Sequence, residues 1–420
     1  FQKIMKLIYR ILSDLFLVIS PIIIIYRILK KKEKFNRLTE RYAIPSKKRL
    51  NGKLIWFHCS SVGELLSIIS LIEKLENNSK IKQILVTTTT LSSSKIFERF
   101  KFKKTIHQFF PIDNNFIVNK FIKYWRPSVL FLCESEIWPN LINNIYKRKI
   151  NLILLNGRMT FRSFKKWKKI KSYSEEIFSK FNICFSQNHE TFLRLKFLGA
   201  KKVINLGNLK FTTSKKIKTQ LLNQKILNFF KKKIILVTGA STHDNEEDFI
   251  IKNHLYFKKQ KKIKNIISII APRHIDRTEK IKNYIKNFSL KTHLYSSGKR
   301  IDKDVDIFIV DTYGELNKFY KISNIVFMGG SLIKHGGQNP LEASKFGCKI
   351  IHGPHIGNFT EIYRKLKKMK ISDVFSNHNK GIKIIENSLY KKKLIFNNKK
   401  IIKYGENILN KTYIEIIKFV

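Results

Sequence analysis

Short apolar runs, each followed by a helical stretch, recur along most of the chain and constrain its fold more than any other feature. Strand–helix alternation of this kind predicts parallel sheets that are covered by helices on both faces. The expected strands of the first half lie at 54–58, 84–88, 128–133, 151–155, 183–186 and 203–206. Those of the second half lie at 233–238, 266–270, 307–310, 325–328 and 349–351.

A Lys-rich stretch from Thr212 to Lys233 interrupts this alternation, and 420 residues are too many for one ordinary core. The sequence therefore predicts an α/β protein of two doubly wound, Rossmann-like domains, at 49–212 and 213–420. The second ends in a basic helical tail from about 380. Because ligands bind beyond the carboxyl ends of strands in such sheets, we expect the domains to face a cleft.

Residues 1–48 precede the alternation and read as a membrane anchor with a basic connector. Ile11–Tyr26 is apolar apart from four residues, but its 16 residues are fewer than the ~20 that span a bilayer upright. A short tilted span and an interfacial helix both fit, and a buried core helix is the alternative. Arg27 and Lys30–Lys32 follow, which favours keeping the rest of the chain in the cytoplasm.

The formal net charge of +53 predicts anionic partners, such as acidic lipid headgroups or phosphorylated substrates. The charge is spread along the chain without a compact basic arm, which disfavours a nucleic-acid-binding protein. The four cysteines share no metal-type spacing, and no HExxH or Walker motif occurs. We expect neither a metal nor a cofactor.

Glu64 ends the segment His58–Glu64, which joins the first expected strand to a helix expected from about Gly63 to Leu75. A carboxylate in that position can act as general base on a substrate hydroxyl. Ser61 and Glu64 also fit a capping box, in which the glutamate only satisfies backbone N–H groups. The spacing leaves both interpretations open.

Further charged residues follow two later strands. Glu134 and Glu136 come directly after 128–133 and precede a Trp-Pro pair, and Arg158 follows 151–155. Either carboxylate can face a ligand or pair with a Lys or Arg. Arg158 fits an anionic substrate group and a surface carboxylate equally well.

The second half carries a denser set of motifs at strand ends. Ser241 lies in a small-residue turn that could cradle phosphate, and Arg273 ends the next strand with a cation suited to phosphate or carboxylate. Gly329 and Gly330 allow close approach of a ligand to the backbone. Asn339 and Glu342 fit a nucleotide site, and they also fit helix-capping positions.

Seven segments in this order resemble the family of 3-deoxy-D-manno-octulosonic acid (Kdo) transferases of lipopolysaccharide biosynthesis, over about residues 33–366. The segments are Phe57–Glu64, Glu134–Asn140, Gly207–Phe211, Ser241–His243, Pro272–His274, Asp311–Leu316 and Gly329–Glu342. The chain departs from the family pattern at Gln338, where His is usual, and at Gly157, where Ala is usual.

The resemblance implies a GT-B glycosyltransferase that moves Kdo from CMP-Kdo to a lipid A precursor of the lipid IVA type, with inversion and without metal. It places the enzyme at the cytoplasmic face of the inner membrane, against anionic lipids. The acceptor is expected on the N-terminal domain and CMP-Kdo mainly on the C-terminal one. Alternatives are a GT-B enzyme that uses a UDP-sugar and, remotely, a nucleic-acid-binding protein.

Carried over to this chain, the family pattern makes Glu64 the catalytic base. The expected donor-binding residues are Ser241, Arg273, Gly329, Gly330, Asn339 and Glu342. The expected acceptor or cleft residues are Glu134, Glu136, Arg158 and Lys210.

Overall fold

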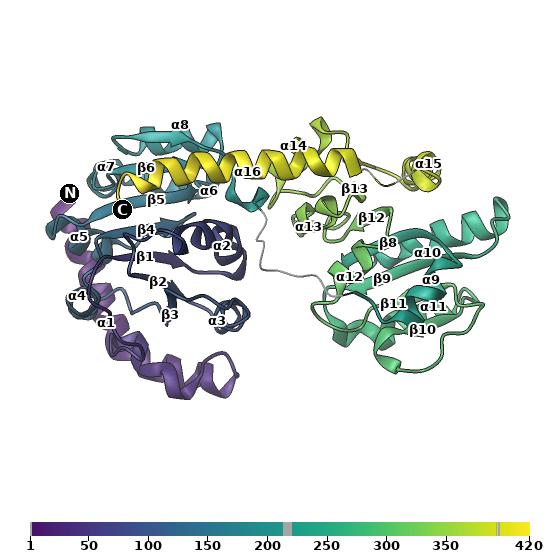
Figure 1. Ribbon diagram of the computed structural model, residues 1–420, viewed down its shortest axis with the longest axis horizontal. Helices are drawn as coiled ribbons and strands as arrows, with labels where there is room; N and C mark the ends of the chain where they lie inside the picture. The colour runs from purple at the N-terminus through teal and green to yellow at the C-terminus, as the bar shows by residue number, and fades with distance from the viewer. Residues whose placement is uncertain (1, 213–220, 392, 394) are drawn as a thin grey trace. The chain divides into compact units, whose positions relative to one another are not determined.

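The computed structural model describes residues 2–212, 221–391, 393 and 395–420, which form two compact units (Figure 1). Unit 1 comprises Phe1–Ile217 together with Tyr404–Val420, and unit 2 comprises Lys218–Lys403. Part of the predicted linker, 213–220, lies outside the described residues. That unit 1 binds the acceptor and unit 2 binds the donor stays a prediction.

Unit 1 is built on a seven-stranded parallel sheet in the order β3-β2-β1-β4-β5-β6-β7. Its strands are β1 (Leu54–Cys59), β2 (Gln83–Thr88), β3 (Thr105–Phe109), β4 (Val129–Cys133), β5 (Asn151–Gly157), β6 (Ile183–Ser186) and β7 (Val203–Asn205). Its helices include α2 (Val62–Glu76), α3 (Leu91–Phe97), α4 (Asn115–Trp125), α5 (Pro139–Lys147), α6 (Phe161–Lys169), α7 (Lys171–Phe178) and α8 (His189–Phe197). Two 3-10 turns, η1 (Phe35–Tyr42) and η2 (Leu209–Phe211), complete the unit.

Unit 2 repeats this architecture with the order β10-β11-β9-β8-β12-β13-β14, also parallel throughout. Its strands are β8 (Ile234–Thr242), β9 (Ile266–Pro272), β10 (Thr292–Leu294), β11 (Ile307–Ile309), β12 (Ile325–Met328), β13 (Lys349–His352) and β14 (Ser372–Val374). Its helices include α9 (Gln224–Lys231), α10 (Glu247–Leu255), α11 (Thr278–Lys286), α12 (Leu316–Tyr320), α13 (Leu341–Lys345), α14 (Thr360–Lys368) and α15 (His378–Leu389). The predicted α/β class, with two doubly wound sheets, is confirmed.

The central strands are apolar along their whole length because both faces of each sheet are covered. All six residues of β1 are buried. Leu54 and Trp56 enter one core cluster with Leu130 and Leu132 of β4. Since successive side chains of a strand point to opposite faces, Phe57 belongs to the other face.

Helix α1 (Gln2–Leu29) lies along the outside of unit 1 and is longer than the apolar run that predicted it (Figure 1). It is long and apolar enough to cross a membrane by length and composition. Ser20 is its one buried residue, while Met5 and Leu17 pack against the core of unit 1. The alternative of a buried core helix is therefore wrong.

The last helix, α16 (Ile395–Ile417), begins in unit 2 and ends on unit 1. Within unit 1, Ile408 is buried against Gly207, and Lys74 Nζ donates to Asn410 Oδ1 at 2.7 Å. The C-terminal residues are thus a packed part of unit 1.

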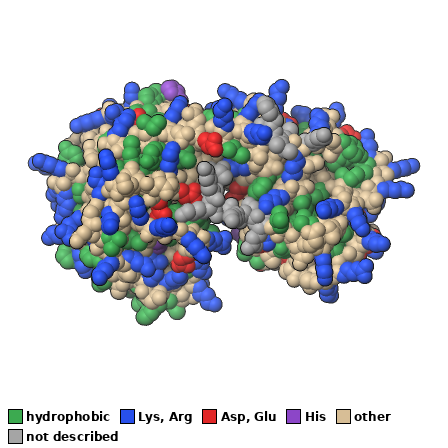
Figure 2. Space-filling model, viewed as in Figure 1, with side chains coloured by type: hydrophobic (Ala, Val, Ile, Leu, Met, Phe, Trp, Pro, Cys, Tyr) green, Lys and Arg blue, Asp and Glu red, His purple; other side chains and the backbone are tan. Residues whose placement is uncertain are grey.

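Lys and Arg side chains are scattered over the visible face of both units, with no single basic patch (Figure 2). This distribution matches the even spread of charge along the sequence.

Candidate functional site

The charged motifs of unit 1 follow β1 and β4, which are neighbours in the sheet but not in sequence. Strand order reverses between these two strands, and such a switch point is where doubly wound sheets bind ligands. In unit 2 the corresponding pair is β8 and β12, which carry the Ser241 and Gly329 motifs at their carboxyl ends. Both units therefore present their motifs at the position where this topology makes a crevice.

Glu64 stands in the first turn of α2 with its carboxylate turned back to the preceding loop. Oε2 accepts from the Ser60 backbone N–H at 2.8 Å and Oε1 accepts from Ser61 Oγ at 3.2 Å. Ser61 Oγ in turn accepts from the Glu64 N–H at 3.3 Å. The expected capping interaction is present, and it fixes the position of the carboxylate.

The same carboxyl group has an abnormal proton affinity. Burial, reinforced by the negative charges of Glu136 and Glu134, raises the pKa of Glu64 to about 7. The two capping hydrogen bonds oppose this shift but do not cancel it. A carboxylate with this pKa is a stronger base than an ordinary glutamate and is half ionised near neutral pH.

The surroundings of Glu136 have the opposite effect on its pKa. Its Oε2 atom is 3.2 Å from His58 Nε2 and accepts from Trp138 Nε1 at 2.8 Å. Burial disfavours its charge, but the bonds from His58, Ser60 and Trp138 outweigh burial and lower the pKa of Glu136. It stays ionised and places a negative charge close to Glu64.

Glu134 is held by an ion pair and by a strained backbone. Its φ of 55° is left-handed, as is the φ of 52° at Asn156. Lys210 Nζ lies 2.6 Å from Glu134 Oε1, and Asn156 donates to the same oxygen at 3.4 Å. The structure thus brings together Glu134 and Lys210, which the sequence predicted separately.

Arg158 follows β5 and is half-buried. Its backbone N–H donates to Glu134 O at 3.0 Å. Its guanidinium has no hydrogen-bond or ion-pair partner within 2–212, 221–391, 393 and 395–420. It is therefore available to an anionic group.

In unit 2, Ser241 adopts a left-handed φ of 55° within the end of β8. A Cβ atom on Gly329 would lie 2.1 Å from Ser241 O, so only glycine permits this approach of the two strand ends. Gly329 therefore permits the turn that carries Ser241, whereas Gly330, with a left-handed φ of 65°, lies against the side chains of His335 and His243.

Glu246, which sequence analysis missed, organises the Gly329–Leu332 loop. This fully buried carboxylate accepts from the N–H groups of Gly330, Ser331 and Leu332 at 2.6, 2.9 and 2.9 Å, and from His243 N at 2.9 Å. The Glu246 side chain thus satisfies these four backbone N–H groups within the protein itself. Two adjacent acids after a small-residue turn, in a chain with few acids, are the sequence signal that could have revealed it.

Cations and imidazoles gather beside this loop. The ring centroids of His243 and His335 are 4.2 Å apart, and His274 lies 5.9 Å from His243. Partial burial and these neighbours, with Arg273, lower the pKa of His243. Arg273 is exposed and lacks a side-chain partner in the described part of the chain, so its charge can meet an anion.

Asn339 and Glu342 lie at the start of the short helix α13, and both side chains are exposed. Asn339 Oδ1 accepts from Leu341 N at 3.1 Å, which is the capping contact. Gln338, one of the two departures from the family pattern, has its Nε2 atom 3.1 Å from His243 Nε2. It therefore belongs to the same polar cluster as the histidines.

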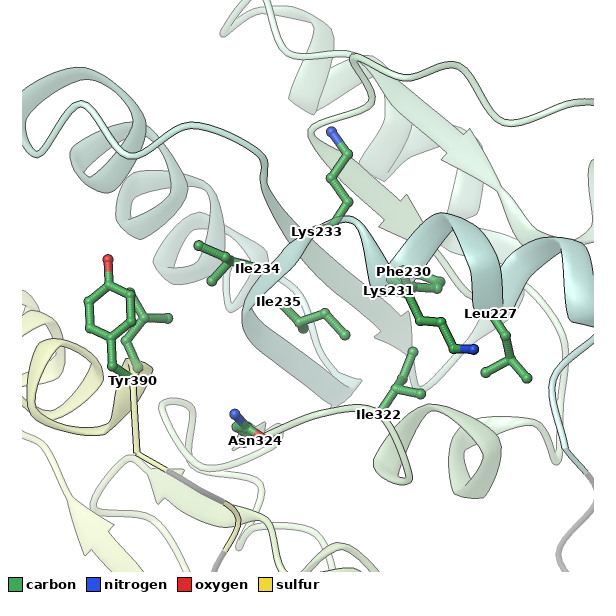
Figure 3. Close-up of a pocket in the computed structure, with 10 residues that line it drawn as sticks. Leu227, Phe230, Lys231, Lys233, Ile234, Ile235, Ile322, Asn324 and Tyr390 are labelled. Carbon is green, nitrogen blue, oxygen red and sulfur yellow. The ribbon is translucent and has the colours of Figure 1, made fainter.

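A cavity of about 430 Å³ lies elsewhere in unit 2, at the amino ends of the strands (Figure 3). Ile234 and Ile235 of β8 line it together with Asn324, which precedes β12. Since the motifs lie at the carboxyl ends of these strands, this cavity is separate from the candidate site. Among the described residues, no group of three or more His, Cys, Asp or Glu is placed to hold a metal.

Comparisons with known proteins agree with this arrangement. The family model of 3-deoxy-D-manno-octulosonic-acid transferase (kdotransferase) matches residues 36–213. The 3-deoxy-D-manno-octulosonic acid transferase of Rickettsia bellii is 33% identical over 422 residues, which cover 98% of this chain and 99% of the relative. That of Haemophilus influenzae is 29% identical over 364 residues, with 85% of each chain covered.

The fold has solved counterparts as well. A putative UDP-N-acetylglucosamine 2-epimerase from Listeria monocytogenes superposes with a TM-score of 0.59 at 12% identity, over 87% of this chain and 96% of the epimerase. That likeness concerns the two-unit GT-B architecture alone. The 33% identity to the Rickettsia bellii Kdo transferase, over nearly the full length of both chains, goes further. It shows that the chain belongs to the Kdo transferase family of glycosyltransferases, which act in lipopolysaccharide biosynthesis.

Proposed function

We propose that this Kdo transferase moves Kdo from CMP-Kdo to a lipid A precursor of the lipid IVA type, with inversion, without metal, and with Glu64 as general base. The observation that carries the proposal is the state of Glu64. Its carboxylate is fixed by capping bonds, yet its pKa is raised to about 7.

Comparison of the three clustered carboxylates supports Glu64 over its neighbours. Glu134 is paired with Lys210, and Glu136 accepts from Trp138 and contacts His58. The hydrogen bonds lower the pKa of Glu136, which makes it a poor proton acceptor, and Lys210 occupies the Glu134 carboxylate. Environments that push the pKa values of neighbouring carboxyls apart commonly separate a base from its supporting charges.

The proposed step is an in-line displacement at the anomeric carbon of Kdo. The acceptor hydroxyl oxygen forms the new bond while its proton passes to Glu64. The bond from the anomeric carbon to the CMP phosphate oxygen breaks, and CMP leaves with the electron pair. Attack from the face opposite the leaving group inverts the anomeric centre.

Residues of unit 2 are proposed to hold the donor. The free guanidinium of Arg273 can bind the CMP phosphate and stabilise the charge that develops as it leaves. Ser241, Asn339 and Glu342 offer polar contacts. Gly329 permits the close approach of the Ser241 turn, and Gly330, which has no side chain, lets the donor approach the loop closely. In unit 1, the guanidinium of Arg158 offers a cation to a phosphate of the acceptor, and the Lys210–Glu134 pair is proposed to line the acceptor side of the site.

The exposed apolar side of α1 supports a site of action at a membrane, which we propose to be the cytoplasmic face of the inner membrane with its anionic lipids. Lys30–Lys32, directly after α1, would meet acidic headgroups.

The test is incubation of the purified protein with CMP-Kdo and tetraacylated lipid A precursor in excess EDTA, followed by mass spectrometry of the lipid. We expect an increase in mass by one or more Kdo residues, and the increment gives the number transferred. Glu64→Gln keeps the capping geometry but cannot accept the proton, so we expect it to bind CMP-Kdo normally and to lose roughly 10²–10⁴ in rate.

Glu73→Gln on the same helix is the matched control and should transfer normally. Transfer by Glu64→Gln within about fivefold of the parent would refute the base assignment. Activity that EDTA abolishes and a divalent ion restores would refute metal independence.

A further inference from the structure

An apolar slot lies between α1 and the body of unit 1. It has a volume of about 270 Å³. Phe16, Ile23 and Ile24 of α1 form one wall, and Phe110, Ile112 and Trp138 form the other. The volume is slightly below that of a typical small-molecule pocket, so the slot suits part of a molecule rather than a whole glycolipid.

Polar contacts hold α1 against the body and so keep this slot in shape. Tyr9 OH donates to Asp113 Oδ2 at 2.7 Å, and Ser20 Oγ lies 3.0 Å from Tyr42 OH. Near the end of the helix, Arg27 Nε donates to Glu33 Oε1 at 2.9 Å. These contacts are spread along most of the helix, which is therefore docked lengthwise on unit 1.

The opposite side of α1 is a continuous exposed apolar surface. Side chains there are exposed by 55% at Leu15, 70% at Ile22 and 58% at Ile25. Exposed apolar surfaces of this kind mark contact with membranes or partners. A hydrocarbon chain could pass from a bilayer on this side into the slot without crossing much water.

One wall of the slot leads to the carboxylate cluster. Trp138 lines the slot while its indole N–H donates to Glu136, whose charge contributes to the raised pKa of Glu64. A molecule with its chain in the slot would therefore hold its polar end near the proposed base.

The slot also has a charged border that favours an anionic lipid. Arg27 and Arg41 share the single carboxylate of Glu33, at 2.9 and 3.0 Å. At this border two guanidiniums meet one carboxylate, and the Arg27 side chain is 35% exposed. Asp113, which also lines the slot, accepts from Tyr9 OH and from two backbone N–H groups. A phosphate on the lipid would complement the two guanidiniums.

We propose that this slot binds an acyl chain of the phosphorylated glycolipid acceptor and thereby positions the acceptor beside Glu64. The inference rests on the proposed function. The slot is a binding site for hydrocarbon, separate from the polar groups that hold the sugar.

A kinetic experiment tests the slot with a matched pair of variants of the full chain. Ile24→Phe fills the slot, whereas Ile25→Phe makes the same change on the exposed side of the same helix. With the tetraacylated precursor, we expect Ile24→Phe to lower kcat/KM about tenfold and Ile25→Phe to leave it within twofold. With the fully deacylated precursor, both variants should match the parent.

A labelling experiment on the unsubstituted protein gives an independent readout that needs no transfer. The probe is the tetraacylated precursor with a photoreactive diazirine on an acyl chain, in vesicles, with peptide mapping after irradiation. We expect adducts at Phe110–Asp113 and Trp138, which an undirected membrane lipid would not reach. A diacylglycerol probe with the same diazirine, which has no phosphate to meet the arginines, should label the exposed side of α1 instead.

The outcomes separate the two proposals. Equal loss by Ile24→Phe on both acceptors, equal behaviour of the two variants, or labelling at Phe110–Asp113 by both lipids would each overturn the slot. If the parent protein transfers Kdo to neither acceptor, the proposed function is overturned instead. The labelling experiment would still report on the slot, because it needs no transfer.

Discussion

The carboxylate of Glu64 is capped and basic at once, because capping fixes where its oxygens lie while burial and neighbouring charges set its proton affinity. Capping bonds favour the ionised form, yet the pKa is still raised to about 7. Burial and the charges of Glu136 and Glu134 are therefore the stronger influence. The pKa of Glu64 can therefore be tested by removing one of these neighbouring charges, with Glu64 itself left unchanged.

We predict that the transfer rate rises with pH through about 7, because Glu64 must lose its proton before it can accept one. Glu134→Gln removes one of the negative charges that raise this pKa and leaves Lys210 unneutralised. Both effects lower the pKa of Glu64, so the midpoint of the pH–rate profile should move to lower pH.

The measurement is the rate of Kdo transfer at saturating substrates between pH 5 and 9. Glu98→Gln changes an exposed carboxylate of the same unit and should leave the midpoint in place. A midpoint that stays fixed in Glu134→Gln, or moves upward, would mean that the titrating group is not Glu64.

At the scale of secondary structure, short loops at strand ends are held by carboxylates that lie far away in sequence. Glu246, in front of α10, binds three successive N–H groups of the loop after β12. The interaction joins the two strands of the switch point in unit 2. Its loss should therefore affect stability more than an ordinary surface change.

We predict that Glu246→Gln lowers the free energy of unfolding by at least about 2 kcal/mol. The amide has one acceptor oxygen where the carboxylate had two, and each buried donor left unpaired costs about 1–3 kcal/mol. Urea denaturation followed by circular dichroism measures the change. Asp248→Asn, which alters a surface ion pair with Lys252 on the same helix, should cost less than about 1 kcal/mol.

Helix α1 gives a second prediction at this scale. Leu15→Asn combined with Ile22→Asn should lower association with vesicles by tenfold or more, because each buried aliphatic side chain contributes about 1.5–3 kcal/mol. The fold should not change, since both side chains are more than half exposed. Flotation with phosphatidylglycerol vesicles measures binding, and Leu193→Asn, an exposed change on α8, is the control.

Strands were predictable from sequence where both of their faces are buried, and every strand that was missed lies at an edge. β7 (Val203–Asn205) is the one edge strand that was predicted. The central strands β1 and β4 are continuous apolar runs. The three strands that sequence analysis did not identify, β3, β10 and β14, are edge strands. Polar residues weaken the apolar pattern of these strands. His107 is buried with its Nε2 atom 2.8 Å from Thr88 Oγ1. Asp373 is partly exposed and pairs with Lys349.

For the whole molecule, two parallel sheets of the same design divide the charged motifs between two units. The position of each motif at a strand end was predictable, because it needs only the local order of strand and turn. The pairing of Lys210 with Glu134, and of Glu246 with the Gly329–Leu332 loop, was not. These contacts join segments that are distant in sequence, and only the order of the strands brings them together.

This division predicts that donor binding and proton transfer can be impaired independently in the full chain. Arg273→Ala should weaken CMP binding by about tenfold or more, because a charged hydrogen bond to phosphate contributes about 1.5–3 kcal/mol. Glu64→Gln should leave CMP binding unchanged, since Glu64 belongs to unit 1 and acts on the acceptor in our proposal.

Isothermal titration calorimetry with CMP measures both variants at the same salt concentration, because a net charge of +53 attracts any anion. Arg300→Ala removes an exposed arginine of unit 2 outside the motif cluster and reports this general attraction. If Arg273→Ala and Arg300→Ala weaken binding equally, the effect is diffuse electrostatics, and Arg273 is not a donor contact. If Glu64→Gln also weakens CMP binding tenfold, its carboxylate contributes to the donor site, and the separation of roles between the units is wrong.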